Sequence, residues 1–250
     1  MKARLIKYPG RKWLKHESLW GEPELREYLP ETELFSPQAF IQMIKRYPVL
    51  FVKPDIGMQG QGVMKVTRED DTYVIQTAAQ KLIYYDLKKV ALKLKKLIGA
   101  ETFLVQQGID LIQFNGSPVD FRALLHHKPN GKWRFFGIMG KVAAKNQFVT
   151  NHSSGGRPIR LHQALGIPRE NSAQWDLLIK KFSILIADTM KQHFPKITEL
   201  GLDIAIDANR KIWLLEANTK PQFQLFKYHS NPRLFAQISY SVRMLRDTAD

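Results

Sequence analysis

The chain has 250 residues, 44% of them hydrophobic and 24% charged, which is typical of a globular protein large enough to bury a sizeable core. Its formal net charge is +15, from 38 Lys and Arg against 23 Asp and Glu, and such a charge favours polyanions or nucleotide phosphates as partners. The absence of cysteine excludes disulfides, thiolate catalysis and Cys-ligated metal sites. The sequence contains no run of about 18 apolar residues, so no membrane span is predicted. The first residues lack the apolar core of a signal peptide, so a cytoplasmic location is expected.

The amino-terminal part of the chain, residues 1–48, is predicted to be a helical segment that leads into the main fold. A first helix is expected to begin near Lys12, and residues 29–32 are expected to form a loop. Ser36 has the side chain of a helix N-cap, and Pro37 suits the first helical position. A second helix is therefore predicted to begin at Pro37.

A lysine followed by a glycine-rich loop is the most informative stretch. Residues 49–52 are apolar and β-rich, which predicts a buried strand that ends at Lys53. Gly57, Gly60 and Gly62 then alternate through a loop, where glycine permits positive φ and lets backbone N–H groups face an anion. The stretch is compatible with a phosphate clamp and equally with an ordinary glycine-rich hairpin.

Two common phosphate-binding motifs are excluded at this stretch. A P-loop requires Gly-Lys-Ser/Thr after the glycines, and no such sequence follows Gly62. In a kinase glycine-rich loop the lysine comes after the glycines, whereas Lys53 precedes them.

The remaining elements predict an α+β protein with antiparallel sheets. Strands are predicted over residues 63–67, 72–76, 82–85, 102–106, 119–126, 133–136, 138–143, 204–207 and 212–215. Long helices are predicted over about 172–193 and 232–245. A further helix carries Lys88, Lys89, Lys93, Lys95 and Lys96 opposite an apolar stripe. Because no recognised nucleic-acid motif accompanies these lysines, a solvated helix face is favoured over a nucleic-acid site.

Two carboxylates and an amide lie at the edges of the last two predicted strands. Asp203 and Glu216 lie at comparable edges of strands joined by a short turn, so pairing of the strands can bring them together. Glu216 and Asn218 point to the same face because side chains alternate along a strand. Such oxygen atoms suit Mg²⁺, whereas two close carboxylates without a cation would repel. A magnesium site is favoured over an exposed acidic hairpin, because Glu216 ends the apolar run of residues 213–215.

Taken in chain order, these features resemble the ATP-grasp fold. The matching positions are Lys12, Phe51 to Pro54 with the three glycines, Val105 to Gly108, Asp120 to Arg122, Asn151 with Gly155 and Gly156, Asp203, and Glu216 to Asn218. The chain looks most like the spore-coat-associated YheC/YheD family, through residues 28–32, 105–109 and 120–156. It is also similar to the glutamate ligase that modifies a ribosomal protein. The match extends from Lys12 to about Phe223.

The resemblance implies two α+β lobes with antiparallel sheets that clasp ATP. The small lobe, with the glycine-rich loop, would span residues 49–107, and the large lobe, with the metal site, would span residues 108–250. ATP-grasp ligases usually carry a further domain before the first lysine, and the eleven residues before Lys12 are too few for one. We therefore expect this amino-terminal domain to be largely absent.

The resemblance also implies which residues bind the nucleotide. They are Lys12, Lys53, Gly57, Gly60, Gly62, Gln106, Gln107, Gly108, Ile109, Asp120 and Asn151. The two lysines would contact the phosphates, with Lys15 as an alternative to Lys12, and the glycine loop would close over them. The hinge from Gln106 to Ile109 would read adenine through its backbone. Asp120 would hold the ribose or a nearby amino group, and Asn151 would line the pocket.

The catalytic and metal roles follow from the same resemblance. Asp203, Glu216 and Asn218 would hold Mg²⁺. Arg122 and Lys141 would neutralise the γ-phosphate or an acyl-phosphate intermediate.

Three points qualify these implied roles. The hinge usually has an acidic residue where Gln107 stands, and Lys141 occupies a place often held by arginine, which loses bidentate phosphate recognition. Arg122 has a structural alternative, which is pairing with Asp120 across a strand.

The expected function is an ATP- and Mg²⁺-dependent carboxylate–amine ligase that acts through an acyl phosphate. Its carboxylate and amine substrates are not identified, although acidic or peptidic ones are compatible with the charge. The alternative is a non-catalytic nucleotide-binding protein of the spore coat, or an interaction protein, that retains the fold. Neither a membrane nor a specific nucleic acid is an expected partner.

Overall fold

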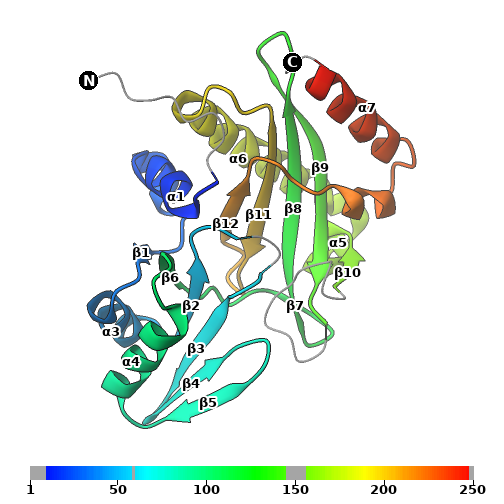
Figure 1. The fold of residues 1–250 in the computed structure, drawn as a ribbon. Helices are drawn as coiled ribbons and strands as arrows, with labels where there is room; N and C mark the ends of the chain where they lie inside the picture. The colour runs from blue at the N-terminus through cyan, green and yellow to red at the C-terminus, as the bar shows by residue number, and fades with distance from the viewer. Residues whose placement is uncertain (1–9, 58–59, 145–155, 248–250) are drawn as a thin grey trace, which may run out of the picture.

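The computed structural model describes residues 10–57, 60–144 and 156–247, and within them two six-stranded antiparallel sheets with packed helices form two lobes (Figure 1). The small-lobe sheet has the order β1 (Thr32–Leu34), β6 (Phe103–Gln107), β2 (Val49–Pro54), β3 (Met64–Glu69), β4 (Thr72–Gln76) and β5 (Lys81–Tyr84). The large-lobe sheet has the order β10 (Arg157–Ile159), β9 (Trp133–Val142), β8 (Ser117–His127), β11 (Glu199–Ile206) and β12 (Ile212–Asn218), with β7 (Gln113–Phe114) paired to β8.

Two helices with local capping signals cover the small-lobe sheet. In α3 (Pro37–Arg46) the Ser36 hydroxyl accepts a hydrogen bond from the backbone N–H of Ala39 at 3.0 Å. In α4 (Leu87–Ile98) the Asp86 carboxylate caps the first turn. Both helices contribute apolar side chains to one core with the sheet, including Phe40, Ile44, Leu50, Val52, Val90 and Leu94. Because one face of each helix is buried in this core, apolar residues recur at helical spacing in the sequence.

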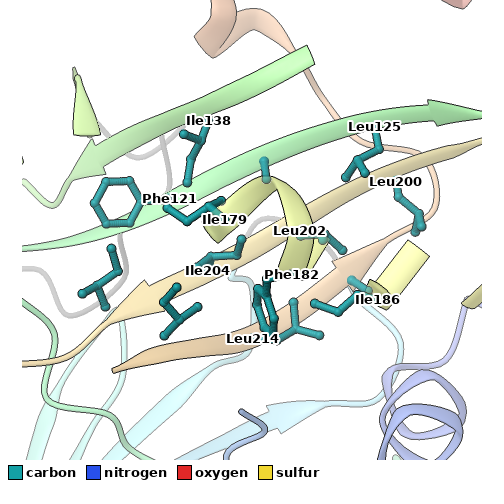
Figure 2. Close-up of a cluster of buried hydrophobic side chains, with 14 of the residues drawn as sticks. Phe121, Leu125, Ile138, Ile179, Phe182, Ile186, Leu200, Leu202, Ile204 and Leu214 are labelled. Carbon is teal, nitrogen blue, oxygen red and sulfur yellow. The ribbon is translucent and has the colours of Figure 1, made fainter. Parts of the chain in front are cut away.

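The large-lobe sheet is covered on both faces. On one face α6 (Ser172–His193) places Ile179 and Phe182 against Leu202 of β11 (Figure 2). On the other face α7 (Leu234–Asp247) packs Ile238 against Leu124 of β8. The shorter helices α1 (Lys12–Trp20), α2 (Pro23–Arg26) and α5 (Leu161–Leu165) add to the first core. Residues along β8 therefore alternate between two buried environments.

The chain crosses between the lobes twice. Leu25 and Leu29 belong to the large-lobe core, yet the next element, β1, pairs with β6 in the small lobe. Residues 30–31 therefore carry the first crossing. The second crossing follows β6 through residues 108–112, where the backbone N–H of Ile112 donates to the Ile206 carbonyl of the large lobe at 2.9 Å. The small lobe is thus held by two chain segments.

The expected α+β fold with antiparallel sheets is confirmed, although several elements differ locally from the expected ones. Residues 133–136 and 138–143 were expected as separate strands, but residues 133–142 form the single strand β9. A register shift opposite Leu124 and Leu125 absorbs the extra residue as a bulge. The expected loop at residues 29–32 ends one residue early, because Thr32 begins β1, a strand too short to show a pattern of its own.

Among the described residues, no helix is both long enough and apolar enough to cross a membrane. The proposed lobe boundaries at residues 48 and 107 stay a prediction.

Candidate functional site

A pocket of about 200 Å³ lies between the two lobes. The small lobe and the segment before it contribute Lys12, Lys53, Gly57 and Gly60 to its lining, and the large lobe contributes Arg122, Lys141, Asp203, Glu216 and Asn218. These residues come from separate segments of the chain and include most of the predicted phosphate, catalytic and metal-binding side chains. The fold therefore brings together in one pocket the groups that the sequence singled out.

Strand register creates the charged row of the large lobe. Asp203 on β11 is paired with Arg122 on β8 at one side and with Glu216 on β12 at the other. Asp120, two residues before Arg122, is paired with Lys141 on β9. Because residues directly opposite each other share a face, four neighbouring strands carry their charges on the same side of the sheet.

Asp203 is the most heavily hydrogen-bonded carboxylate of this row. Arg122 donates to it twice, from Nε to Oδ1 at 3.0 Å and from Nη2 to Oδ2 at 2.9 Å. Lys141 Nζ donates to Oδ1 at 3.0 Å, and the Asn218 amide donates to Oδ2 at 2.9 Å. Burial would raise the pKa of Asp203, but the charges of Arg122 and Lys141 hold it below the usual range. The carboxylate is therefore ionised at neutral pH.

Lys141 joins two carboxylates. Its Nζ lies 3.1 Å from Asp120 Oδ2 as well as 3.0 Å from Asp203 Oδ1, and the side chain is buried. Burial would lower the pKa of Lys141, but Asp120 and Asp203 together raise it. The structural alternative for Arg122 is therefore wrong in its partner, since Arg122 pairs with Asp203, and Lys141 is the residue paired with Asp120.

The lysines of the opposite wall surround Glu216. Lys12 Nζ and Lys15 Nζ each lie 3.9 Å from Glu216 Oε1. Lys12 also donates to the Gly57 carbonyl at 2.8 Å, which ties the first helix to the glycine-rich loop, whereas Lys15 donates to the Ala217 carbonyl at 2.6 Å. Both lysines thus lie beside the predicted metal ligand, and Lys12 is the one that contacts the loop.

Lys53 is the last residue but one of β2 and lines the pocket, where its Nζ donates to Gln106 Oε1 at 2.8 Å. Burial lowers the pKa of Lys53 to about 8, opposed by Glu216 and reinforced by the positive charges of Lys12 and Lys15. A nearby anion such as a phosphate would stabilise the charged form of Lys53 and raise its pKa again.

The glycine-rich loop has the backbone conformation that its composition predicts. Gly60 and Gly62 have φ of 73° and 72°, the left-handed region that other residues rarely occupy. Gly57 and Gly62 both pack against the ring of Pro54, which fixes the start and end of the loop relative to β2. Of the three glycines, Gly57 and Gly60 line the pocket.

The predicted hinge residues lie at the end of β6 and the start of the second crossing. Within the small-lobe sheet, Gln106 accepts from Lys53 and donates to Thr32 Oγ1 at 2.9 Å. The backbone N–H of Gln107 donates to Glu31 O at 2.8 Å. Gly108 lies so close to β2 that an added Cβ would fall 2.6 Å from Val49 Cγ1. The fourth residue, Ile109, is half-buried in the same crossing. Adenine recognition by this segment stays a prediction.

Two further predicted residues, Asp120 and Asn151, are not among the described residues that line the pocket. Asp120 is buried and ion-paired with Lys141, so its proposed contact with ribose or an amino group stays a prediction. Asn151 lies outside the described residues.

Sequence reasoning missed several residues that the structure brings to the site. Lys220, Gln222 and Gln224 line the main pocket, and their alternating polar pattern directly after Asn218 was the available signal. His16 and Thr32 line a smaller cavity of about 30 Å³ behind Lys53, together with Gln106 and Leu215. Their position depends on contacts between distant segments, which left no local signal.

The donor set at the end of β11 and β12 fits Mg²⁺ in its chemistry. Asp203 and Glu216 face each other across paired strands, and Asn218 follows on the same face. No group of three His, Asp or Glu side chains gathers among the described residues, so the Asn218 amide oxygen is the third protein ligand available. Two carboxylates and one amide oxygen leave positions for water and phosphate oxygens, as Mg²⁺ requires.

Comparison with known proteins gives a consistent result. Residues 7–243 match the family model described as YheC/D like ATP-grasp. The endospore coat-associated protein YheD of Bacillus subtilis (strain 168) is 30% identical over 227 residues, covering 87% of this chain and 49% of YheD. YheC of the same organism, also described as endospore coat-associated, is 26% identical over 234 residues, covering 87% of this chain and 64% of YheC. The chain thus spans about half to two thirds of these relatives.

A solved structure shares the fold. D-alanyl-alanine synthetase A from Vibrio cholerae O1 biovar eltor superposes with a TM-score of 0.55 at 14% identity, covering 95% of this chain and 65% of that one. At this identity the likeness concerns the fold alone.

Proposed function

This chain belongs to the YheC/D-like ATP-grasp family, and on that basis we propose that it binds ATP with Mg²⁺ and uses it to join a carboxylate to an amine. The observation that carries the proposal is the interlobe pocket, in which Lys12 and Lys53 on one side face Arg122, Lys141 and the carboxylate row on the other. Clustered cationic side chains beside paired carboxylates suit the binding of a nucleoside triphosphate together with a divalent metal ion.

The phosphates would lie between the loop and the charged row. Lys12 and Lys53 would contact them as point charges, and the Gly57–Gly62 loop would cover them. Positive φ at Gly60 and Gly62 supports this placement, since it lets the backbone approach an anion closely. Lys53 would exchange its contact with Gln106 for a phosphate oxygen, which favours its charged form.

The adenine end would lie toward the smaller cavity, between Gln106 and Leu215. That cavity, at about 30 Å³, holds at most about two water molecules. Binding the base would therefore require the lobes to separate there. The two crossings at residues 30–31 and 108–112 are the segments about which such a movement would occur.

Asp203, Glu216 and Asn218 would hold Mg²⁺, which would neutralise phosphate charge during transfer. In the absence of the metal, Arg122 and Lys141 supply positive charge to Asp203. On metal binding their hydrogen-bonding groups would become available to the γ-phosphate and to the carboxylate substrate, where developing charge is greatest.

The reaction would proceed in two balanced steps. A substrate carboxylate oxygen attacks the γ-phosphorus, and the bond between that phosphorus and the β–γ bridging oxygen breaks. ADP is the leaving group, and the substrate becomes an acyl phosphate. An amine nitrogen then attacks the acyl carbon, the carbon–oxygen bond breaks, phosphate leaves and the nitrogen loses its proton to solvent or phosphate. Arg122 and Lys141 would stabilise the negative charge of both steps.

A second candidate is a nucleotide-binding protein that does not catalyse ligation and is associated with the spore. Two relatives are described as endospore coat-associated. The chain spans only part of their length. Spore association is proposed for this chain under either candidate, with synthesis in the cytoplasm.

The two candidates are separated by measuring binding and turnover on the same protein. Thermal stabilisation by ATP with Mg²⁺ tests the nucleotide site, and ADP release with mixtures of amino acids and peptides tests ligation. Stabilisation with acceptor-dependent ADP release supports the ligase. Stabilisation with no ADP release above background favours the second candidate, and absence of both contradicts the nucleotide site itself.

A further inference from the structure

The main pocket continues beyond the metal-site residues along the segment that follows β12. Lys220, Gln222 and Gln224 line it there, and Gln61 of the glycine-rich loop lines the same pocket. All four side chains are polar, and none of them is a ligand in the proposed metal or phosphate sites. This part of the pocket therefore offers polar groups that the proposed nucleotide contacts do not use.

The segment from Lys220 to Leu225 is held in place at both ends. Pro221 is buried against β11, where a Cβ added to Gly201 would lie only 2.5 Å from Pro221 Cβ. Leu225 is 5% exposed and packs in the core beneath α7. Because its flanking residues are fixed, the segment presents Gln222 and Gln224 as a built wall of the pocket.

The charge of the pocket leaves room for a second anion. Its described lining contains five cationic side chains, Lys12, Lys53, Arg122, Lys141 and Lys220, and two carboxylates, Asp203 and Glu216. Asp203 is already paired with Arg122 and Lys141. A nucleotide held with Mg²⁺ would engage the lysines near the loop, whereas Lys220 extends the positive charge along the segment after β12. A substrate that carries a carboxylate there would be attracted.

The two glutamines add hydrogen-bonding groups to this part of the pocket. A primary amide offers both donors and an acceptor, so Gln222 and Gln224 can pair with the N–H and C=O groups of a peptide bond. Both glutamines line the pocket from this one segment.

We propose that Lys220, Gln222 and Gln224 form a subsite for an acidic peptide, with its reactive carboxylate beside Arg122 and a second carboxylate at Lys220. The inference rests on the proposed ligase function and names the class of its carboxylate substrate. Peptide bonds of the substrate lie along the Gln222–Gln224 wall.

The probes are the dipeptides Glu-Glu and Gln-Gln, which match in size and differ in side-chain charge. Their affinities are measured by calorimetry with the purified chain, in the presence and absence of a non-hydrolysable ATP analogue with Mg²⁺. The variants are Lys220→Ala and Gln222→Ala/Gln224→Ala. Lys96→Ala is the matched control, since Lys96 is an exposed lysine on α4 away from the pocket.

The unmodified chain is expected to bind Glu-Glu about tenfold more tightly than Gln-Gln. Lys220→Ala should remove that preference, the double glutamine variant should weaken both dipeptides, and Lys96→Ala should match the unmodified chain. Equal affinity for the two dipeptides, absence of dipeptide binding, or a preference unchanged in Lys220→Ala would overturn the subsite. If the nucleotide analogue fails to bind, the proposed ATP site is contradicted instead, and the titration without nucleotide still decides the subsite.

Discussion

Glu31 and Gln107 join the two interlobe crossings through reciprocal hydrogen bonds. The Gln107 backbone N–H donates to the Glu31 carbonyl at 2.8 Å, and the Glu31 backbone N–H donates to Gln107 Oε1 at 3.2 Å. The Glu31 carboxylate is itself held by Arg46 and accepts from Tyr47 at 2.7 Å. Gln107, which replaces the acidic residue usual at the hinge, therefore has a structural task in this chain. The two crossings act as one connection, so lobe movement must bend both.

Substitution of Gly108 tests how closely this connection is packed. In Gly108→Ala the new Cβ would lie 2.6 Å from Val49 Cγ1 and 2.9 Å from the Val49 carbonyl oxygen. Backbone atoms cannot move aside cheaply, so a loss of about 1–3 kcal/mol in the free energy of unfolding is expected. Urea denaturation measures it, with Gly10→Ala as control because no atom lies within 4 Å of a Cβ there. Equal stability of the two variants would show that the hinge packing is looser than described.

ATP with Mg²⁺ is expected to raise the melting temperature of the chain by roughly 5–11 °C at about 100 times Kd. Lys53→Ala should lose most of this rise, because it removes a positive charge that lines the pocket. Lys96→Ala, an exposed lysine on α4, should keep it. Differential scanning fluorimetry makes the comparison. No rise in the unmodified chain at millimolar Mg-ATP would contradict the nucleotide site.

Titration of Lys53 gives ATP binding a defined pH dependence. The pKa of this lysine is lowered from 10.5 to about 8, first by burial. Above pH 8 the free protein loses the proton, while bound phosphates would favour its retention, so ATP affinity should fall as pH rises through 8. Lys53→Arg keeps its charge in this range and should flatten the profile. Calorimetric titrations at pH 7 and pH 9 would show the difference, and parallel profiles for the two proteins would exclude Lys53 as the group responsible.

The same shift has the opposite effect on the stability of the free chain. Between pH 8 and 10.5 the unfolded state binds more protons at Lys53 than the folded state does. The contribution of this residue to the free energy of unfolding therefore rises with pH across that window. Denaturation in the absence of nucleotide should show this rise relative to Lys53→Ala, so ligand binding and stability change in opposite directions.

Local patterns in the sequence were sufficient for much of the fold. The helix cap at Ser36 and the apolar run at residues 49–52 are short-range features, and the predicted elements lie close to the observed α3 and β2. The meeting of Asp203 and Glu216 was also predictable, because only a short turn separates their strands.

Contacts that depend on distant strands were not predictable from one sequence. Arg122 and Asp203 are 81 residues apart, and their pairing requires β8 to lie between β9 and β11 in a definite register. A shift of one residue would reverse the face of each side chain. The same limit applies to Lys220 and its neighbours, whose place in the pocket depends on Pro221 packing against Gly201.

Arg122 and Glu216 should separate binding from catalysis. Arg122 is proposed to act on charge that develops during phosphoryl transfer, so Arg122→Ala should retain most ATP affinity while ADP release falls by about 10²–10³. Arg122→Lys keeps a positive charge but loses the paired donors now directed at Asp203, and it should recover only part of the rate.

Glu216→Gln should instead lose ATP affinity and turnover together, because the proposed metal ligand acts in the ground state as well. Because glutamine has nearly the same shape as glutamate, the loss of affinity would come from the lost charge and not from lost packing. Circular dichroism checks that each variant folds, since Arg122 and Asp203 form a partly buried pair whose disruption is costly. The measurements are ATP Kd by calorimetry and ADP release with an accepted substrate. If Arg122→Ala lost ATP binding as fully as Glu216→Gln, Arg122 would be a ground-state binding residue and its proposed role in the transition state would be wrong.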